Sequence, residues 1–350
     1  MISYVIFFLV ESTLLFISRV TNSLNLRMLA CIVAIGFCGL RFETGYDYNS
    51  YRDFFENISI YNDVLELGFV YFIHLGNELG ISSFSFFFIF ALATHGIAFY
   101  TLSKISTNPD MAIFIYLLIP GLYLNSFSVV RSAYALSIFI YAAFKLIKNN
   151  AVYQYFVWGL LAASFHITAI LPFLLTFIIY VSPKYPISRY LFFILLGVSF
   201  LVGFQSSFAQ SILNMFVYTK FSAYAEWDTQ QSAIKIFSTN LLAIYIIYHL
   251  KYFRSCKNSL FFFKIWFIGL LIYNIFMNFT PVTRMTYYFT FFSIPLLLSS
   301  IAVYSGKFRI LSQSILLIFF SMAFIAALYN DYLATDVLKM SNYKTIFDAP

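Results

Sequence analysis

Apolar residues occur along this chain in long blocks that are separated by short polar connections. The blocks lie near residues 2–18, 28–42, 82–101, 111–126, 128–147, 190–206, 234–250, 265–278, 285–304 and 310–329, with a further apolar stretch at 153–181. A helix needs about 20 apolar residues to cross the hydrocarbon core of a bilayer. The pattern therefore predicts an all-α, polytopic transmembrane helical bundle of about 11–13 segments, with residues 1–350 forming one integral membrane domain.

The stretch at 153–181 needs separate treatment, because a single helix there would invert the orientation of every later connection. We expect two short segments near 152–163 and 167–181, hinged around Ser164, Phe165 and His166. These segments form either a re-entrant hairpin or two passes through a thin membrane. The first block has no basic flank and no clear small-residue cleavage site, which favours a retained helix over a signal peptide.

The composition excludes several classes of protein. Hydrophobic residues make up 61% of the chain and charged residues 10%, whereas a soluble domain carries about 25% charged residues. A soluble enzyme, a disordered tail and a DNA-binding module are therefore excluded. The three cysteines, Cys31, Cys38 and Cys256, form no C-x-x-C pair, which excludes a disulfide framework and a structural zinc site. No P-loop or G-x-G-x-x-G occurs, so we expect no nucleotide-derived cofactor. No D-x-D and no ligand cluster occurs either, so we expect no metal.

Charge predicts the orientation of the segments. One set of connections holds 13 basic residues and a single acid, Asp110. The alternate set, counted with the flanking Arg41 and Arg131, holds 8 basic residues and 12 acids, and Glu11 lies inside the first block. Basic loops stay cytoplasmic. The net charge of +7 is therefore a topology signal, and both termini and the polar loop 43–81 are predicted to face outward.

Three arginines and one histidine depart from this charge rule. Arg41, Arg131 and Arg284 lie at the outer ends of apolar blocks, and His166 lies at the outward hinge. A lone arginine at a helix end is often a snorkelling or topology-setting residue, but such residues belong on the inner side. A guanidinium presents a fork of donors that fits phosphate oxygens. The four residues therefore predict an anionic ligand at the outer leaflet.

Two outer connections add candidate residues. The loop 43–81 carries acids interleaved with tyrosines, Asp47, Tyr51 and Glu66 among them, which suits sugar hydroxyls as well as a merely solvated loop. The second connection, 208–233, contains an amphipathic piece that predicts an interfacial helix.

Five short motifs, in order along residues 40–290, resemble those of the Wzy-type O-antigen and exopolysaccharide polymerases, the EpsG-like group. The residues that carry the resemblance are Arg41-x-x-x-Gly45-x-Asp47-x-x-x-Tyr51, Glu66-x-Gly68-Phe69, Val130-Arg131-Ser-Ala-Tyr-Ala135, Phe165-His166-Ile-Thr168-Ala169, and Arg284 followed by Tyr287-Tyr288-Phe289. One position departs from the family pattern: Ser132 stands where the family often has Gln.

The resemblance implies a GT-C-type fold in the bacterial inner membrane with a periplasmic active face. The implied enzyme is a glycosyltransferase of O-antigen, lipopolysaccharide or related surface polysaccharide biosynthesis. It moves the growing glycan from undecaprenyl diphosphate to the terminal sugar hydroxyl of another lipid-linked repeat unit. The implied partners are a Wzz-like chain-length regulator and a Wzx-like flippase of the same pathway.

The resemblance also suggests a role for each candidate residue. Arg41, Arg131 and Arg284 are expected to bind the diphosphate, because fixed cations stabilise the charge that develops on it. His166 is expected to be the general base, since its ordinary pKa is near neutrality, and Asp47 is the rival for that role. Glu66 and Tyr51 are expected to position sugars or to brace the loop.

Three alternatives remain. An O-antigen ligase-like transferase shares the lipid donor, but that family usually has a larger late outer domain. A lipid-linked oligosaccharide flippase would show cations through a central cavity and two similar halves, neither of which the sequence shows. A membrane acyltransferase would carry an H-x-x-x-x-D box, which is missing.

Overall fold

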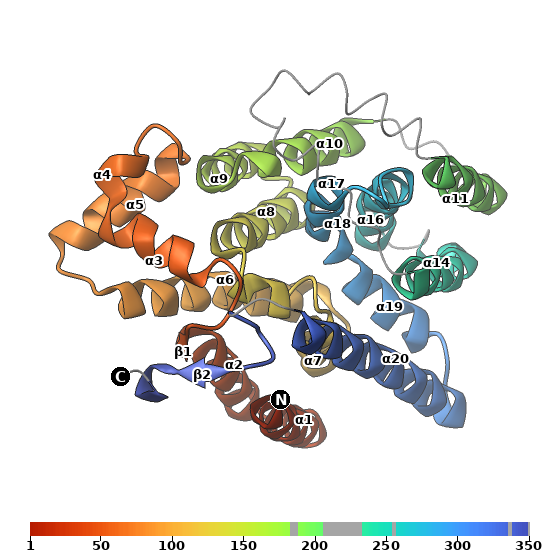
Figure 1. Ribbon diagram of the computed structural model, residues 1–350. Helices are drawn as coiled ribbons and strands as arrows, with labels where there is room; N and C mark the ends of the chain where they lie inside the picture. The colour runs from red at the N-terminus through yellow and green to blue at the C-terminus, as the bar shows by residue number, and fades with distance from the viewer. Residues whose placement is uncertain (183–187, 206–232, 254–256, 335–337, 349–350) are drawn as a thin grey trace. The chain divides into compact units, whose positions relative to one another are not determined.

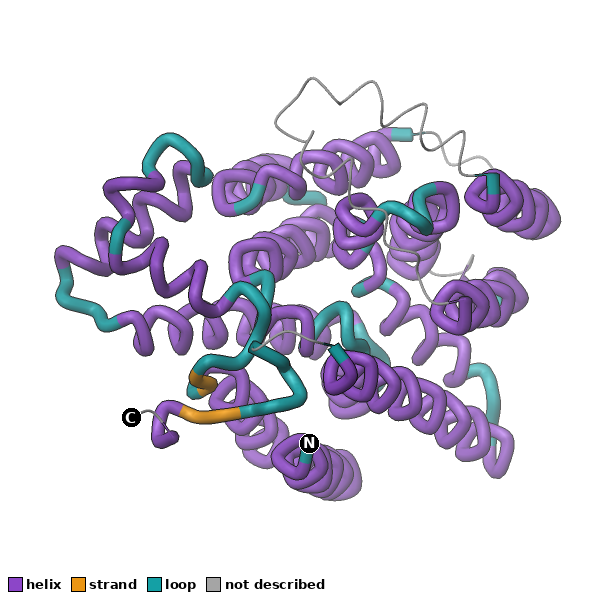
Figure 2. The backbone as a smooth tube through the Cα atoms, in the orientation of Figure 1, coloured by secondary structure: helices purple, strands orange, loops and turns teal. Residues whose placement is uncertain are grey.

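The computed structural model describes residues 1–182, 188–205, 233–253, 257–334 and 338–348, and these are almost entirely helical (Figures 1 and 2). They form two compact units, Met1–Phe173 with Ile310–Pro350, and Leu174–Arg309. The predicted single domain of 1–350 stays a prediction. The predicted interfacial helix at 208–233 falls almost wholly outside the described residues.

The first unit contains most of the long apolar helices. Its helices are α1 (Ile2–Thr21), α2 (Leu24–Gly39), α3 (Tyr48–Glu56), α4 (Ile58–Tyr61), α5 (Leu67–Glu78), α6 (Ser83–Ile105), α7 (Pro109–Leu118), η1 (Leu124–Phe127), α8 (Val130–Asn149), α9 (Val152–Phe165), η2 (Ile167–Ala169), the start of α10 (Ile170–Val181) and most of α20 (Gly306–Leu333). The unit also contains the polar loop 43–81, which lies between α2 and α6 in the sequence. The described strands, β1 (Arg41–Phe42) and β2 (Lys344–Thr345), pair antiparallel, and η3 (Ile346–Asp348) follows them.

Twelve of the described segments are apolar enough to lie in a membrane. Five helices are long enough to cross one, namely α1, α6, α8, α20 and Asn258–Ile275 of α16 (Lys257–Ile275). A sixth span forms if Pro281–Thr290 and Ser293–Ala302, bent by 43°, are taken together, and six apolar helices are shorter. The predicted all-α polytopic bundle is confirmed, and the chain is a multi-pass membrane protein.

Two apolar blocks are interrupted where the sequence pattern alone suggested continuity. The block at 111–126 stops as a helix at Leu118, because Pro120 disfavours the helical conformation in the residue before it. The block at 285–304 is divided into α18 (Tyr287–Thr290) and α19 (Ser293–Ala302).

The predicted hinge near residue 166 is confirmed. Helix α9 ends at Phe165, and His166 is extended with φ −157° and ψ 116°. The hydroxyl of Tyr155 donates to the carbonyl of Phe173 at 2.5 Å, and the Phe173 ring lies against Gly159. The chain therefore turns back on itself at His166.

A buried ion pair joins three helices of the first unit. Arg27 of α2 donates two hydrogen bonds of 2.8 Å to Asp110 of α7, and Ser18 of α1 donates a third at 2.7 Å. Asp110 is buried. Arg27, one of the basic residues that set the predicted topology, is thus neutralised by its contact with Asp110.

The second unit is held by polar side chains between apolar helices. Its helices are the remainder of α10, α11 (Arg189–Phe204), α14 (Ala233–Tyr248), α15 (Leu250–Phe253), α16, α17 (Thr280–Met285), α18 and α19. The side-chain amides of Asn240 and Asn274 exchange two hydrogen bonds of 2.9 and 3.0 Å, and Asn274 also donates to Ser199. Such pairs stabilise helix contacts in lipid.

Candidate functional site

The site is built on the polar loop between α2 and α6, which packs on the start of α8. Gly45 adopts φ +110°, and a Cβ atom there would lie 2.3 Å from the carbonyl oxygen of Phe127. The next residue, Tyr46, donates its backbone N–H to Ser128 Oγ at 3.1 Å. Gly45 of the first motif is therefore required both by its backbone conformation and by this close approach.

Helix α3 and the start of α5 place aromatic rings around Arg131. The guanidinium carbon lies 5.8, 5.7 and 5.3 Å from the ring centroids of Tyr51, Phe54 and Phe69. The Tyr51 hydroxyl also accepts the backbone N–H of Arg131 at 3.4 Å. Rings at this distance attract a cation and hold the guanidinium in one place.

Gly68 brings α5 against the end of α9. A Cβ atom at Gly68 would lie 2.4 Å from Ser164 Oγ and 2.9 Å from the Ser164 carbonyl oxygen. Only a residue without a side chain allows this approach. Glu66, at the N-terminal cap of α5, is brought beside the hinge in this way.

The carboxylate of Glu66 bridges Arg131 and His166. Oε2 accepts from Arg131 Nη1 at 2.5 Å, and Oε1 lies 3.1 Å from His166 Nδ1. Oε1 also accepts the backbone N–H of Ile167 at 3.3 Å. The side chains of Arg131 and Glu66 are each 19% exposed and that of His166 is 25% exposed, so the cluster is half-buried but reachable.

The charges and hydrogen bonds of the cluster determine the ionisation state of Glu66 and the tautomer of His166. Burial acts to raise the pKa of Glu66, but the hydrogen bond from His166 and the charge of Arg131 outweigh it and lower this pKa to about 2. An ionised carboxylate only accepts hydrogen bonds, so the proton between the two groups is on His166 Nδ1. In the neutral imidazole Nε2 then carries the lone pair.

Asp47 lies at the N-terminal cap of α3, one helical turn before Tyr51. Burial raises the pKa of Tyr51, the charge of Arg131 opposes this, and the charge of Asp47 adds to it. Asp47 is thus an electrostatic neighbour of the Tyr51 hydroxyl. Its rival role as general base stays a prediction.

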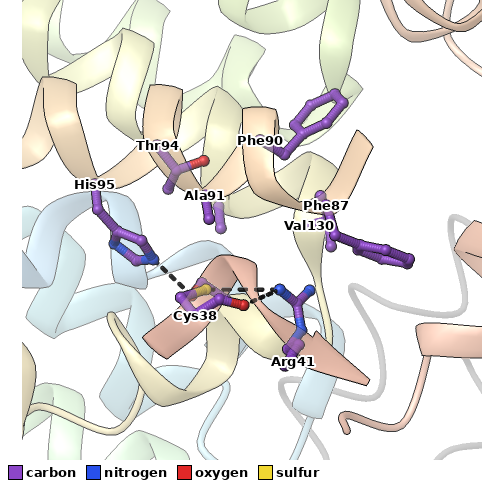
Figure 3. Close-up of a pocket in the computed structure, with 10 residues that line it drawn as sticks. Cys38, Arg41, Phe87, Phe90, Ala91, Thr94, His95 and Val130 are labelled. Atoms are coloured by element: carbon purple, nitrogen blue, oxygen red, sulfur yellow. Dashed lines mark hydrogen bonds between the residues drawn. The ribbon is translucent and has the colours of Figure 1, made fainter. Parts of the chain in front are cut away.

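Arg41 lies apart from this cluster, in a small buried pocket (Figure 3). Its side chain is 2% exposed and donates to the carbonyl oxygens of Cys38 at 2.6 Å and Phe127 at 3.3 Å. The Phe87 and Phe127 rings lie 5.0 and 5.4 Å from the guanidinium carbon. Carbonyls at the C-terminal end of a helix such as α2 carry partial negative charge and stabilise a cation.

The pocket beside Arg41 has a volume of only about 10 Å³ and is lined also by Thr94, His95 and Ser126. That is room for about one water molecule. A direct contact of Arg41 with a diphosphate stays a prediction, and in this conformation the guanidinium is used instead to join α2, η1 and α6.

Arg284 belongs to the second unit. It is exposed on α17, and its guanidinium has no hydrogen-bond partner among the described residues. Its predicted place beside Arg131 stays a prediction.

The pairing of Glu66 was not foreseen from the sequence, which assigned this residue to sugar positioning or loop bracing. The signal available was its place two residues before Gly68 in the second motif. Across the described residues, no group of three or more His, Cys, Asp or Glu side chains is arranged to hold a metal ion.

Glu66 of the polar loop, Arg131 of α8 and His166 of the hinge thus meet within a multi-helix membrane bundle. The chain belongs to the EpsG family of polymerase-like proteins, whose family model matches residues 24–345. Comparison with curated proteins and with solved structures finds no match.

Proposed function

We propose that this protein polymerises lipid-linked oligosaccharide repeat units. It transfers the growing glycan from undecaprenyl diphosphate to the terminal sugar hydroxyl of another lipid-linked repeat unit. The observation that carries the proposal is the Glu66 carboxylate held between Arg131 and His166. In this arrangement His166, oriented by Glu66, is proposed to remove the acceptor proton, and Arg131 is proposed to stabilise the leaving group.

The first function is removal of the acceptor proton. His166 Nε2 takes the proton of the sugar hydroxyl as its oxygen forms a bond to the anomeric carbon of the donor. Glu66 accepts from Nδ1 throughout, so it orients the ring and stabilises the imidazolium that results. This is the arrangement expected of a positioned general base.

The second function is stabilisation of the leaving group. The bond between the anomeric carbon and the phosphate oxygen breaks, and the diphosphate departs with the electron pair. Arg131 lies in the first turn of α8, where the N–H groups and the helix dipole also favour an anion. Arg284 and Arg41 are proposed to supply further positive charge to the leaving diphosphate, Arg41 after its buried pocket opens.

The remaining loop residues are proposed to bind sugar or to brace the loop. Asp47 lies at the N-terminal cap of α3, and its oxygens suit sugar hydroxyls. Tyr51 is 5% exposed and braces the loop, because its hydroxyl accepts the backbone N–H of Arg131. The loop is proposed to face the periplasm, in the bacterial inner membrane, with both termini on that side. A chain-length regulator and a flippase are the proposed partners of the pathway, supplying control of length and the outward-facing substrate.

The test is polymerisation of defined lipid-linked repeat units by the protein in proteoliposomes. Wild-type protein should yield a ladder of products, and Arg131→Ala and His166→Asn should leave single repeat units. Matched controls lie on the polar loop 43–81: Arg52→Ala breaks the exposed pair of Arg52 with Glu56, and His74→Asn removes a partly exposed histidine bonded to Asn62. Both controls should retain the ladder.

Full-length ladders from Arg131→Ala and His166→Asn would overturn the proposal. Repeat units that cross the bilayer without being joined would show a flippase instead. Transfer onto lipid A in place of a repeat unit would show a ligase.

A further inference from the structure

The C-terminal tail of the chain returns to the loop that carries the first motif. Strand β2 (Lys344–Thr345) pairs antiparallel with β1 (Arg41–Phe42), as Figure 1 shows. Beyond the strand, the backbone N–H of Ile346 donates to the carbonyl of Leu40 at 2.9 Å. The tail is thus joined by backbone hydrogen bonds to residues 40–42, where the first motif begins.

Side chains of α1 and α2 fasten the tail further. The Tyr343 ring stacks on Phe37 with centroids 4.1 Å apart and planes 4° from parallel, and its hydroxyl donates to the Phe37 carbonyl at 2.7 Å. The Tyr4 hydroxyl donates to the carbonyl of Met340 at 2.8 Å. The tail is therefore held by side chains of two apolar helices as well as by the strand.

Asp331 joins the tail to the motif loop. It lies near the end of α20 and is 5% exposed. Oδ1 accepts from the Tyr46 hydroxyl at 2.6 Å and from the Met340 N–H at 3.3 Å, and Oδ2 accepts from the Ser341 N–H at 2.6 Å. A buried carboxylate needs such donors to offset its loss of hydration.

Tyr46 stands between Gly45 and Asp47, so Asp331 acts on the motif itself. The loop is fixed at Tyr46 from two sides, by Ser128 at its backbone N–H and by Asp331 at its hydroxyl. We propose that Asp331 and the tail Met340–Asp348 position this loop for glycan transfer, with Asp331 as a positioning residue of the reaction. The inference rests on the proposed function. A misplacement of about 1 Å in such a loop costs about 10²-fold in rate.

Two substitutions separate the role of the tail from that of the loop. Asp331→Asn leaves one acceptor oxygen for the three donors Tyr46, Met340 and Ser341, so it should weaken the attachment of both the tail and the Tyr46 hydroxyl. Tyr46→Phe removes only the hydroxyl and leaves the two backbone hydrogen bonds of the tail in place. Both variants should lower kcat for polymerisation, with an unchanged KM for the lipid-linked donor, because Arg131 is untouched.

Docking of the tail is read independently by thiol labelling. Ser341 is 4% exposed, so Ser341→Cys should react slowly with a maleimide, whereas Phe347→Cys, at a position 82% exposed, should react fast. Asp331→Asn should raise the Ser341→Cys rate toward that of Phe347→Cys, because two of the hydrogen bonds that hold Met340 and Ser341 involve Asp331. Tyr46→Phe should leave it unchanged, and the parent chain gives the background of the native cysteines.

The outcomes distinguish this inference from the proposed function. Wild-type kcat in Asp331→Asn with a more rapidly labelled Ser341→Cys, or wild-type kcat in Tyr46→Phe, would overturn the positioning role while polymerisation stands. A wild-type protein that joins no repeat units would overturn both. A kcat loss in Tyr46→Phe with a protected tail, at an unchanged melting temperature, supports positioning over a general loss of structure.

Discussion

Glu66 Oε2 lies 2.5 Å from Arg131 Nη1, and the other oxygen of the same carboxylate lies 3.1 Å from His166 Nδ1. Arg131 lies 65 positions after Glu66 in the chain, and His166 lies 100 positions after it. One carboxylate thus couples the cation proposed to hold the leaving group to the base proposed to activate the acceptor. Under the proposed function, a diphosphate at Arg131 competes with Glu66 for the guanidinium, and the hydrogen bond of Glu66 to His166 remains.

The first prediction concerns the orienting role of Glu66. In Glu66→Gln the amide has no charge to stabilise an imidazolium, and it can donate to Nδ1 and so favour the wrong tautomer. We expect kcat to fall at least about 10-fold, since general acid–base catalysis contributes about 10²–10⁴-fold. Initial rates of polymerisation in proteoliposomes measure this. A variant with the wild-type rate would mean that His166 needs no carboxylate.

The second prediction concerns pH. The pKa of Glu66 is lowered to about 2 in the folded protein, from an ordinary value of 4.5. A lowered pKa stabilises the fold above the ordinary value, and this contribution is lost as the pH falls from about 4.5 to 2. A pKa difference of one between the folded and unfolded states corresponds to about 1.4 kcal/mol. Because solvent screens part of the interaction at this half-buried carboxylate, the contribution is on the order of 2–3 kcal/mol.

Thermal unfolding in detergent, followed between pH 7 and pH 3, measures that contribution. The melting temperature of wild type should exceed that of Glu66→Gln by a constant amount above about pH 5 and approach it at lower pH. A difference that does not change with pH would show that folding does not lower the pKa of the Glu66 carboxyl group.

The third prediction assigns Arg41 to structure. Its guanidinium holds two carbonyl oxygens and two rings in a buried place, and lysine cannot reproduce that planar fork. Arg41→Lys should lower the free energy of unfolding by about 2–4 kcal/mol, as expected for a broken buried hydrogen-bond network. Arg52→Lys, at an exposed ion pair, is the control and should change it by less than about 0.5 kcal/mol. An unchanged melting temperature combined with lost donor binding would instead place Arg41 on the ligand.

The fourth prediction concerns the close approach of α5 to α9. Gly68→Ala would put a methyl group 2.9 Å from the Ser164 carbonyl oxygen, so the two helix ends must separate and Glu66 must move away from His166. Activity should fall by about 10²-fold, the cost of a misplacement near 1 Å. Gly36→Ala, where nothing lies within 4 Å of the added atom, should leave activity unchanged. Equal activity of the two variants would mean that the reaction does not need this approach.

The fifth prediction concerns the ion pair that joins α1, α2 and α7. Asp110→Asn leaves the guanidinium of Arg27 partly buried without its carboxylate, and breaking such a pair costs about 3–5 kcal/mol. Glu56→Gln removes a carboxylate from an exposed pair and should cost less than about 1 kcal/mol. Chemical or thermal unfolding of both variants in the same detergent tests the difference.

The sequence by itself determined the helical class, because apolar blocks near membrane length leave the backbone no alternative but internal hydrogen bonds. It also located the break at His166, which the charges of the later connections required even though the stretch 153–181 is apolar throughout. The sequence also showed the glycines of the motifs, but it did not show why glycine is required at these positions. Gly45 and Gly68 are required by the Phe127 and Ser164 backbones, which lie 82 and 96 residues further along the chain.

Only the tertiary structure decided which polar side chains meet. The sequence placed Arg41 and Arg131 together as equivalent cations, whereas packing buries Arg41 among carbonyls and rings and leaves Arg131 at the edge of a reachable cluster. The hydrogen bond between Tyr46 and Asp331 of α20, across 285 residues, has no periodic signal. Helix periodicity arises from neighbours three and four residues apart, whereas these contacts depend on how whole helices pack, and a linear pattern of residue types does not encode that.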